Sequence, residues 1–213
     1  MGDEQVLRAQ ICEFGRNLWT KNMVAANDGN ISVRLNDDRI LCTPTGVSKG
    51  YMRPEKLAEL DLDGNLVNGC TVKPSSEVKM HLRVYVEDPS VKAVVHAHPL
   101  YATLFATRGM GLRNTMLPET IVGLGDVPLA PYATPSTHEV PDSIAPFIAG
   151  HMACLLENHG ALTWGKDLMS AYLAMERLES SAHQMWALEL VGGGNDLPSE
   201  EVFKLRALFG VTS

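Results

Sequence analysis

The chain has 213 residues, of which 45% are hydrophobic and 20% are charged, and its formal net charge is −7 at pH 7. This length fits one or two domains, and because no Pro-rich or Ser/Gly-rich linker divides the chain, we expect a single domain over 1–213. The negative charge argues against a nucleic-acid partner, which calls for a basic surface, and no apolar run reaches the roughly 18 residues of a membrane span.

The first third of the chain predicts one long helix followed by short strands. Hydrophobic periodicity and turn residues give these elements in order: an amphipathic helix over 3–23, strands over 31–35 and 40–43, a short helix over 53–60 and a hairpin over 60–67. The hairpin is expected to turn at Asp63 and Gly64, because an Asp-Gly pair between apolar residues favours a tight turn.

The rest of the chain alternates helices with apolar strands. The expected elements are a helix over 74–88, a strand over 91–98, a helix over 100–109, a short strand near 127–131 in the Gly/Pro-rich segment 111–136, a helix over 138–150, a strand and turn over 151–165, and helices over 167–190 and 199–209, the last capped by Ser199. An α/β fold with helices on both faces of one sheet fits this mixture best.

The cysteines and the N-terminus indicate a cellular compartment. The four cysteines are scattered and form no CxxC pair, and the first ten residues are acidic and lack the apolar core of a signal peptide. We therefore expect reduced thiols and a cytoplasmic location.

Two histidines stand one residue apart at the end of the strand expected over 91–98. Side chains two residues apart on a strand point to the same side, so His96 and His98 face together. A catalytic zinc site uses about three protein ligands and keeps one position open. Taken alone, the pair fits equally well one hydrogen-bonded core histidine beside one exposed histidine.

A third histidine strengthens the metal interpretation. His159 also follows an apolar strand, directly before a Gly turn, so three histidines can converge on one edge of the sheet. The four other histidines are weaker candidates, because each falls inside or beside an expected helix or next to a glycine: His81, His138, His151 and His183.

Glu77 is the candidate acid/base. It follows two serines at the start of the helix expected over 74–88, where backbone N–H groups favour anions. The local pattern alone favours a simple capping box with a solvated Glu77. The segments 27–30, 43–46 and 74–76 share small polar side chains and exposed N–H groups that can form an anion-binding nest.

Six motifs in one order resemble the class II aldolase/adducin family, and in particular its L-fuculose-1-phosphate aldolase branch. They are GNISVR (29–34), TPTG (43–46), KPSSEVKMH (73–81), VVHAHPLYA (94–102), APYATPST (130–137) and ENHGALTWG (157–165). The resemblance implies a single three-layer α/β/α sandwich with a largely antiparallel central sheet. It also implies a homotetramer with active sites at subunit boundaries and a small sugar phosphate as substrate.

The resemblance also assigns roles residue by residue. It implies Zn²⁺, with Mn²⁺ or Co²⁺ as alternatives, on His96, His98 and His159. It implies that Glu77 is the catalytic acid/base. The implied phosphate-binding set is Gly29, Asn30, Thr45, Gly46, Ser75 and Ser76. The implied reaction is reversible cleavage of a ketose-1-phosphate to dihydroxyacetone phosphate and an aldehyde.

Two departures from the aldolase pattern leave the substrate open. The segment 112–129 holds no tyrosine, so Glu119 is its nearest polar catalytic candidate, and Phe209 stands where a C-terminal tyrosine is expected. We expect aldol cleavage first. The alternatives are a sugar-acid phosphate decarboxylase, a pentulose-phosphate 4-epimerase, disfavoured because that branch usually carries aspartate at position 77, and a non-catalytic adducin-like interaction domain.

Overall fold

The central feature is a single mixed sheet. The computed structural model describes residues 2–113 and 115–211, and these form a seven-stranded sheet with the strand order β3-β2-β1-β4-β7-β6-β5. Neighbouring strands run antiparallel except for the parallel pair β5 and β6. The strands are β1 (Asn30–Arg34), β2 (Arg39–Cys42), β3 (Ala58–Asp61), β4 (Ala93–Ala97), β5 (Leu129–Ala130), β6 (Ala153–Leu156) and β7 (Gly160–Gly165).

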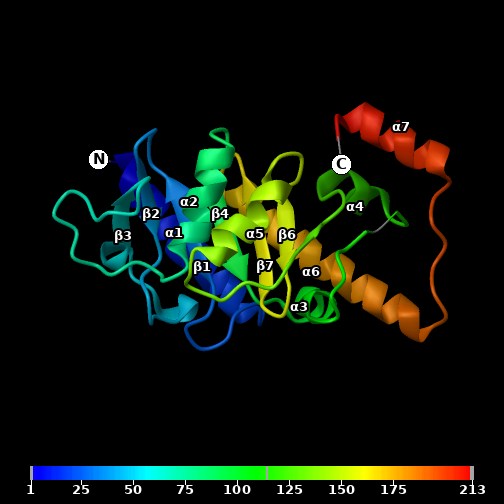
Figure 1. The fold of residues 1–213 in the computed structure, drawn as a ribbon, viewed down its shortest axis with the longest axis horizontal. Helices are drawn as coiled ribbons and strands as arrows, with labels where there is room; N and C mark the ends of the chain where they lie inside the picture. Colours follow the sequence, from blue (N-terminus) through cyan, green and yellow to red (C-terminus); the bar gives the residue numbers. More distant parts are fainter. Residues whose placement is uncertain (1, 114, 212–213) are drawn as a thin grey trace.

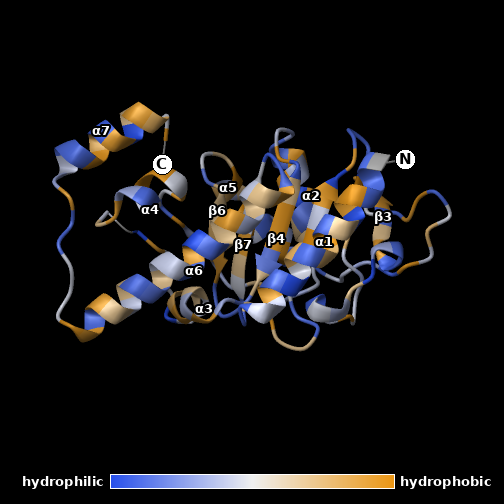
Figure 2. Cartoon of the chain, turned by 180° about the vertical axis from the view of Figure 1, so that it is seen from behind, coloured by the Kyte–Doolittle hydropathy of each residue, from blue (hydrophilic) through white to orange (hydrophobic). Residues whose placement is uncertain are grey.

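Helices cover both faces of this sheet. The helices are α1 (Gly2–Thr20), α2 (Val78–Glu87), α3 (Leu100–Thr107), α4 (Pro118–Gly123), α5 (Glu139–Ile148), α6 (Leu168–Leu190) and α7 (Ser199–Phe209), with short 3-10 turns η1 (Lys49–Tyr51) and η2 (Pro54–Lys56). Helices α1, α3 and α6 pack on one face, and α2 and α5 pack on the other (Figures 1 and 2). The expected three-layer α/β/α arrangement is thereby confirmed.

The apolar character of β4 follows from its place in the middle of the sheet. Successive side chains on a strand point to opposite faces. Val95 therefore lies in the core with α1 and α6, whereas Val94 lies in the core with α2 and α5, and both are fully buried. His96 shares its face with Val94, so it points toward the layer in which α2 begins.

The helix expected over 53–60 is wrong in its second half. Only the 3-10 turn η2 forms, and the chain then enters β3, which pairs antiparallel with β2. Glu59 is buried there and forms ion pairs with Arg8 and Arg39. This pairing between distant residues overrides the local helical propensity. The hairpin after β3 is confirmed by the bridge between Leu60 and Leu66.

The expected and observed elements also differ, to a smaller extent, in the C-terminal half of the chain. Helix α4 lies in the segment for which only a short strand was expected, and its six residues are too few to show helical periodicity. It lies beside α7 at the end of the molecule opposite the N-terminus (Figure 1). The capping position of α7 is occupied by Pro198, so Ser199 is its first residue rather than its cap. Within 2–113 and 115–211, no helix has both the length and the apolar character that crossing a membrane requires.

Candidate metal centre

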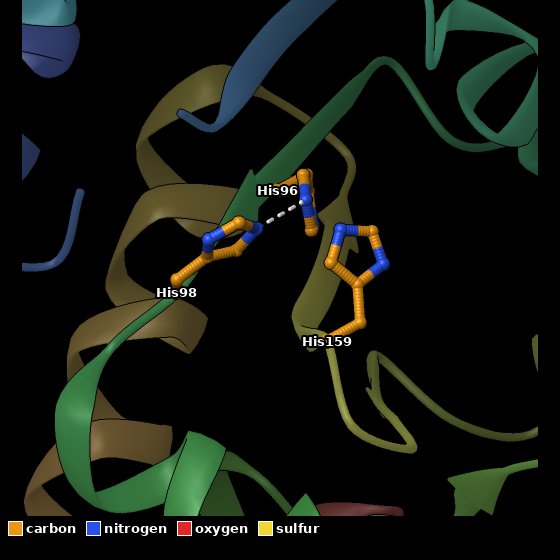
Figure 3. A group of neighbouring side chains, drawn as sticks. All are labelled: His96, His98 and His159. Atoms are coloured by element: carbon orange, nitrogen blue, oxygen red, sulfur yellow. Dashed lines mark hydrogen bonds between the residues drawn. The ribbon is translucent and has the colours of Figure 1, made fainter. Parts of the chain in front are cut away.

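Three histidines from two neighbouring strands converge on one point. His96 lies in β4, His98 follows the end of that strand, and His159 lies in the turn between β6 and β7 (Figure 3). The ring centroids of His96 are 4.9 Å from those of His98 and 4.8 Å from those of His159, and the remaining pair is 5.0 Å apart. One nitrogen of each ring lies within 4.8 Å of those of the other two. The antiparallel pairing of β4 with β7 brings the three together.

The geometry of the histidines fits a divalent metal ion. Nε2 of His96 and Nε2 of His98 are 3.1 Å apart. Two nitrogens bound to one tetrahedral zinc at 2.0–2.1 Å lie about 3.3 Å apart, so little movement would be needed. Nδ1 of His96 donates a hydrogen bond of 2.9 Å to the carbonyl oxygen of Ala161, which leaves the lone pair on Nε2. Ligating histidines commonly donate their second ring nitrogen in this way.

Glu77 turns toward the histidines instead of capping α2. It occupies the capping position of α2, yet its side chain makes no capping hydrogen bond and is only 16% exposed. Its Oε1 lies 3.2 Å from Nε2 of His159, and its Oε2 lies 3.5 Å from Nε2 of His96. Asn30 fixes the carboxylate, because its Nδ2 donates to Oε2 at 3.0 Å. The carboxylate is therefore part of the same cluster.

Electrostatics favour the protonation states that bind a metal cation. Burial lowers the pKa of His96 to about 3, although the charge of Glu77 acts in the opposite direction. Burial also lowers the pKa of His98, and a proton on His159 acts in the same direction. Burial alone would raise the pKa of Glu77, but the neighbouring His96 and His159 and the hydrogen bond from Asn30 hold that pKa well below its usual range. Neutral imidazoles and ionised carboxylates are the ligating forms.

A pocket of about 200 Å³ opens next to the histidines. The six residues that the resemblance assigns to phosphate all line it, together with two of the histidines and the carboxylate: Gly29, Asn30, Thr45, Gly46, Ser75, Ser76, Glu77, His98 and His159. Two backbone hydrogen bonds hold the contributing loops side by side, from Ser75 N to Thr43 O at 3.0 Å and from Thr45 N to Lys73 O at 3.1 Å. The pocket thus joins the metal cluster to loops rich in small polar residues.

Gly29 lets the first of these loops lie against the end of β4. Its φ is +73°, and a Cβ at this position would lie 2.6 Å from Cγ1 of Val24 and 2.9 Å from the carbonyl oxygen of His96. A side chain there would push the loop away from the histidines. Asn30, the next residue, pairs directly with His96 across β1 and β4, and that pairing is what brings the Asn30 amide to Glu77.

The two candidates for the aldehyde end lie elsewhere on the chain. Glu119 is exposed on α4 and lines a separate hollow of about 510 Å³, and Nη1 of Arg177 donates to its backbone oxygen. Phe209 ends α7 and is 59% exposed. Neither contributes to the pocket that holds the histidines of its own chain. A role for Glu119 at a neighbouring subunit's site stays a prediction.

Two further residues lie at this site that were not predicted from the sequence. Asp28 lines the pocket, with its Oδ2 at 3.7 Å from Nδ1 of His98. Lys49 lines the pocket although it is almost completely buried. The sequence did contain a signal for Asp28, because Asp28 lies directly before Gly29 in the turn motif 27–30. No local pattern indicates that a lysine beside a Gly-containing turn is buried.

Comparison with known proteins places the chain among enzymes of one family. The family model described as class II aldolase and adducin N-terminal domain matches residues 9–186. A 3-oxo-tetronate 4-phosphate decarboxylase of Pectobacterium atrosepticum is 34% identical over 88% of this chain and 87% of its own. An L-fuculose phosphate aldolase of Methanococcus maripaludis is 34% identical over 78% of this chain and 89% of its own. The crystal structure of YgbL from Escherichia coli superposes with a TM-score of 0.88 at 32% identity, over 95% of this chain and 99% of that one.

Proposed function

The chain belongs to the class II aldolase and adducin family, and from that premise we propose that it is a metal-dependent lyase that decarboxylates a phosphorylated 3-oxo sugar acid. One observation carries the proposal. Three histidines and Glu77 form one cluster that shares a pocket with all six residues of the phosphate-type loops. A pure interaction domain has no use for that combination.

Aldol cleavage is the reaction expected first from the sequence, whereas the relatives favour decarboxylation over aldol cleavage. Besides the Pectobacterium enzyme, 3-oxo-tetronate 4-phosphate decarboxylases of Escherichia coli and Haemophilus influenzae are 34% and 35% identical to this chain over 87% and 83% of its length. The missing tyrosines also favour decarboxylation over aldol cleavage. Aldol cleavage needs a group to take the proton from the hydroxyl that becomes the aldehyde, whereas decarboxylation releases CO₂ and needs none at that end.

The metal would be held by His96, His98 and His159, and we propose Zn²⁺, with Mn²⁺ or Co²⁺ as alternatives. A bound divalent ion supplies Lewis-acid polarisation of the substrate carbonyl. Three neutral ligands would leave the ion its full positive charge, which suits negative charge developing on the substrate oxygens.

Glu77 is proposed to carry the proton of the reaction. The bond between the carboxylate carbon and its neighbour breaks, CO₂ leaves, and the electron pair stays on the carbon next to the carbonyl. A proton from solution must then reach that carbon, and Glu77 is the acid/base group beside the histidines that can pass it on. For a four-carbon 3-oxo acid 4-phosphate, the product of this balance is dihydroxyacetone phosphate.

The loops that line the pocket are proposed to bind the phosphate. Backbone N–H groups and small hydroxyls around a Gly turn make an anion-binding concavity, and Gly46 has the positive φ of +71° that such a turn requires. Phosphate anchored there would hold the reacting carbons at the metal, which lowers the entropic part of the barrier.

The second candidate is aldol cleavage of an L-fuculose-1-phosphate-like substrate. It is supported by the Methanococcus relative and by a match to an L-fuculose 1-phosphate aldolase structure with a TM-score of 0.87 at 29% identity. In that case Glu119 of a neighbouring subunit would serve the aldehyde end. For either reaction we propose a single domain over 1–213, a cytoplasmic location and a homotetramer with shared sites.

One assay separates the two reactions. Both yield dihydroxyacetone phosphate, so the second product must be measured. We expect the metal-loaded protein to release CO₂ from 3-oxo-tetronate 4-phosphate and to release little aldehyde from L-fuculose 1-phosphate. Glu77→Gln serves as the control that measures the background decarboxylation of the free 3-oxo acid, which is then subtracted. Aldehyde release without CO₂ release would move the assignment to the aldolase.

A further inference from the structure

Lys49 is a buried cation in the wall of the pocket. It is the first residue of η1, it is only 1% exposed, and it lines the same pocket as Thr45, Ser75 and His98. Its Nζ donates to the carbonyl oxygen of Asn27 at 3.0 Å and to that of Val47 at 2.5 Å. The ammonium therefore ties together the loop before Gly29 and the loop after Gly46.

The charge of Lys49 has no direct counter-ion. Among the residues that the structure describes, no carboxylate lies within ion-pairing distance of its Nζ, and Asp28 and Glu77 act on it only at longer range. Burial lowers the pKa of Lys49 to about 8, and the carboxylates of Asp28 and Glu77 partly oppose that shift. A buried charge is costly unless it is paired. Such a residue is better explained by an anion that binds beside it than by the stability of the free protein.

The ammonium also has a hydrogen bond to give. A lysine carries three N–H donors, and the two carbonyl oxygens take two of them in this part of the chain. Asp28 and Glu77 also line the pocket and are negative, the remaining polar groups of the loops are neutral side chains and backbone amides, and the whole chain carries a net charge of −7. A phosphate dianion entering the pocket would therefore meet one positive side chain besides the metal cluster.

We propose that Lys49 is the charged member of the phosphate subsite, where its third N–H and its positive charge bind a phosphate oxygen while its other two N–H groups hold the loops in place. The inference rests on the proposed function in assigning phosphate to these loops. It adds a residue that sets the preference for a doubly charged phosphate monoester over an uncharged sugar. A lysine that only tied the loops would be a structural residue with no effect of charge on binding.

The test uses inorganic phosphate as the probe on the full-length, metal-loaded protein. Lys49→Met keeps the aliphatic part of the side chain and removes the charge. Lys49→Gln also removes the charge but keeps amide donors for the loop carbonyls, so this second variant tests the charge even if Lys49→Met fails to fold. Lys56→Met, at an exposed lysine, is the matched control for net charge. Calorimetric titration should give a phosphate dissociation constant roughly 10- to 100-fold weaker in both Lys49 variants and unchanged in the control. Metal content should be the same in all four proteins.

The outcomes separate this inference from the proposed function. Equal phosphate affinity in wild type and a folded Lys49 variant would overturn the role of Lys49, and so would a wild type that binds no phosphate. A loss of phosphate affinity in the Lys49 variants of a protein that neither decarboxylates nor cleaves sugar phosphates would support Lys49 and reject the proposed reaction. Loss of thermal stability with unchanged phosphate affinity would show a purely structural tie.

Discussion

The side-chain amide of Asn30 donates a 3.0 Å hydrogen bond to Oε2 of Glu77, although 47 residues separate them in the sequence. Asn30 is held in place by its direct pairing with His96 across β1 and β4. The carboxylate is thereby aimed at the histidines from a position that would otherwise suit a helix cap. This relation makes Glu77 part of the reacting centre and gives the first prediction.

Replacing Glu77 by Gln should keep the fold and phosphate binding and should slow turnover by roughly 10²- to 10⁴-fold, the usual effect of losing a positioned acid/base group. The amide has nearly the same shape but cannot carry the proton. The rate would be measured as CO₂ release under saturating substrate. Glu87→Gln, at the exposed end of the same helix, is the control and should leave the rate unchanged. Normal turnover in Glu77→Gln would reduce Glu77 to a structural residue.

Removing one histidine should remove the metal. His98→Ala leaves two imidazoles, which make a poor site, so metal content per chain should fall from about one to near zero and activity should fall with it. Elemental analysis after gel filtration measures this directly. His183→Ala is a matched control, because His183 stacks on Tyr101 away from the cluster. Full metal occupancy in His98→Ala would contradict the assignment of the three ligands.

Much of the fold follows from patterns that act over a few residues. The helix α7 has the bounds expected from its periodicity, and α6 starts directly after Asp167, whose carboxylate accepts from Ser170 N. The first half of β3 was predicted as helix, because Glu59 is polar and its burial depends on Arg8 and Arg39, which lie far away in the sequence. Local propensity cannot report such a pairing.

The candidate site, too, could be predicted from local patterns only in part. The i, i+2 spacing alone placed His96 and His98 on one side of a strand, and in the structure their ring centroids lie 4.9 Å apart. The approach of His159 and Glu77 depends on which strands are neighbours, which the resemblance supplied and the spacing did not. Lys49 was missed because α1 buries it: a Cβ on Gly15 would lie 3.2 Å from the carbonyl oxygen of Lys49. Only the packed tertiary structure contains that contact.

Acid should destabilise the protein partly through His81. Burial lowers the pKa of His81 to about 3, and its Nδ1 is 2.7 Å from Oγ of Ser32. The folded state therefore binds a proton less readily than the unfolded state, so stability is complete above the unfolded pKa of about 6.5 and is lost as the pH falls toward 3. At pH 4.5 the burial of this histidine should cost about 3 kcal/mol of folding stability. Urea unfolding at pH 7 and at pH 4.5 gives the free energy of unfolding at each pH. The decrease between the two should be smaller in His81→Gln than in the wild type, and an equal decrease in both proteins would refute this contribution.

The exposed apolar side chains at the C-terminal end predict an assembly. Five large hydrophobic residues, at the end of α6, directly after it or in α7, are more than half exposed: Leu190, Val191, Phe203, Leu208 and Phe209. Three of them, Phe203, Leu208 and Phe209, lie on the single helix α7, and exposed apolar side chains gathered on one element often mark an interaction surface. We expect light scattering at low micromolar concentration to give about four chains, and Leu208→Lys to shift the population toward smaller species. A wild-type monomer with full activity would exclude shared sites.

The last prediction tests whether Glu119 serves a neighbouring subunit. Glu119 is an exposed residue of α4 and lines a hollow that contains none of the three histidines, so within one chain it lies outside the pocket of the metal cluster. In a head-to-tail ring each subunit gives one surface and receives another, so a site could combine Glu77 of one chain with Glu119 of the next. Glu119→Gln should then lose activity by 10-fold or more without losing metal. Mixing it with inactive Glu77→Gln and letting the subunits exchange should restore activity, because about one site in four would have both glutamates intact in a random 1:1 mixture. Full activity of Glu119→Gln on its own would exclude it from the reaction, and failure of exchanged mixtures to recover would mean that both glutamates act within one chain.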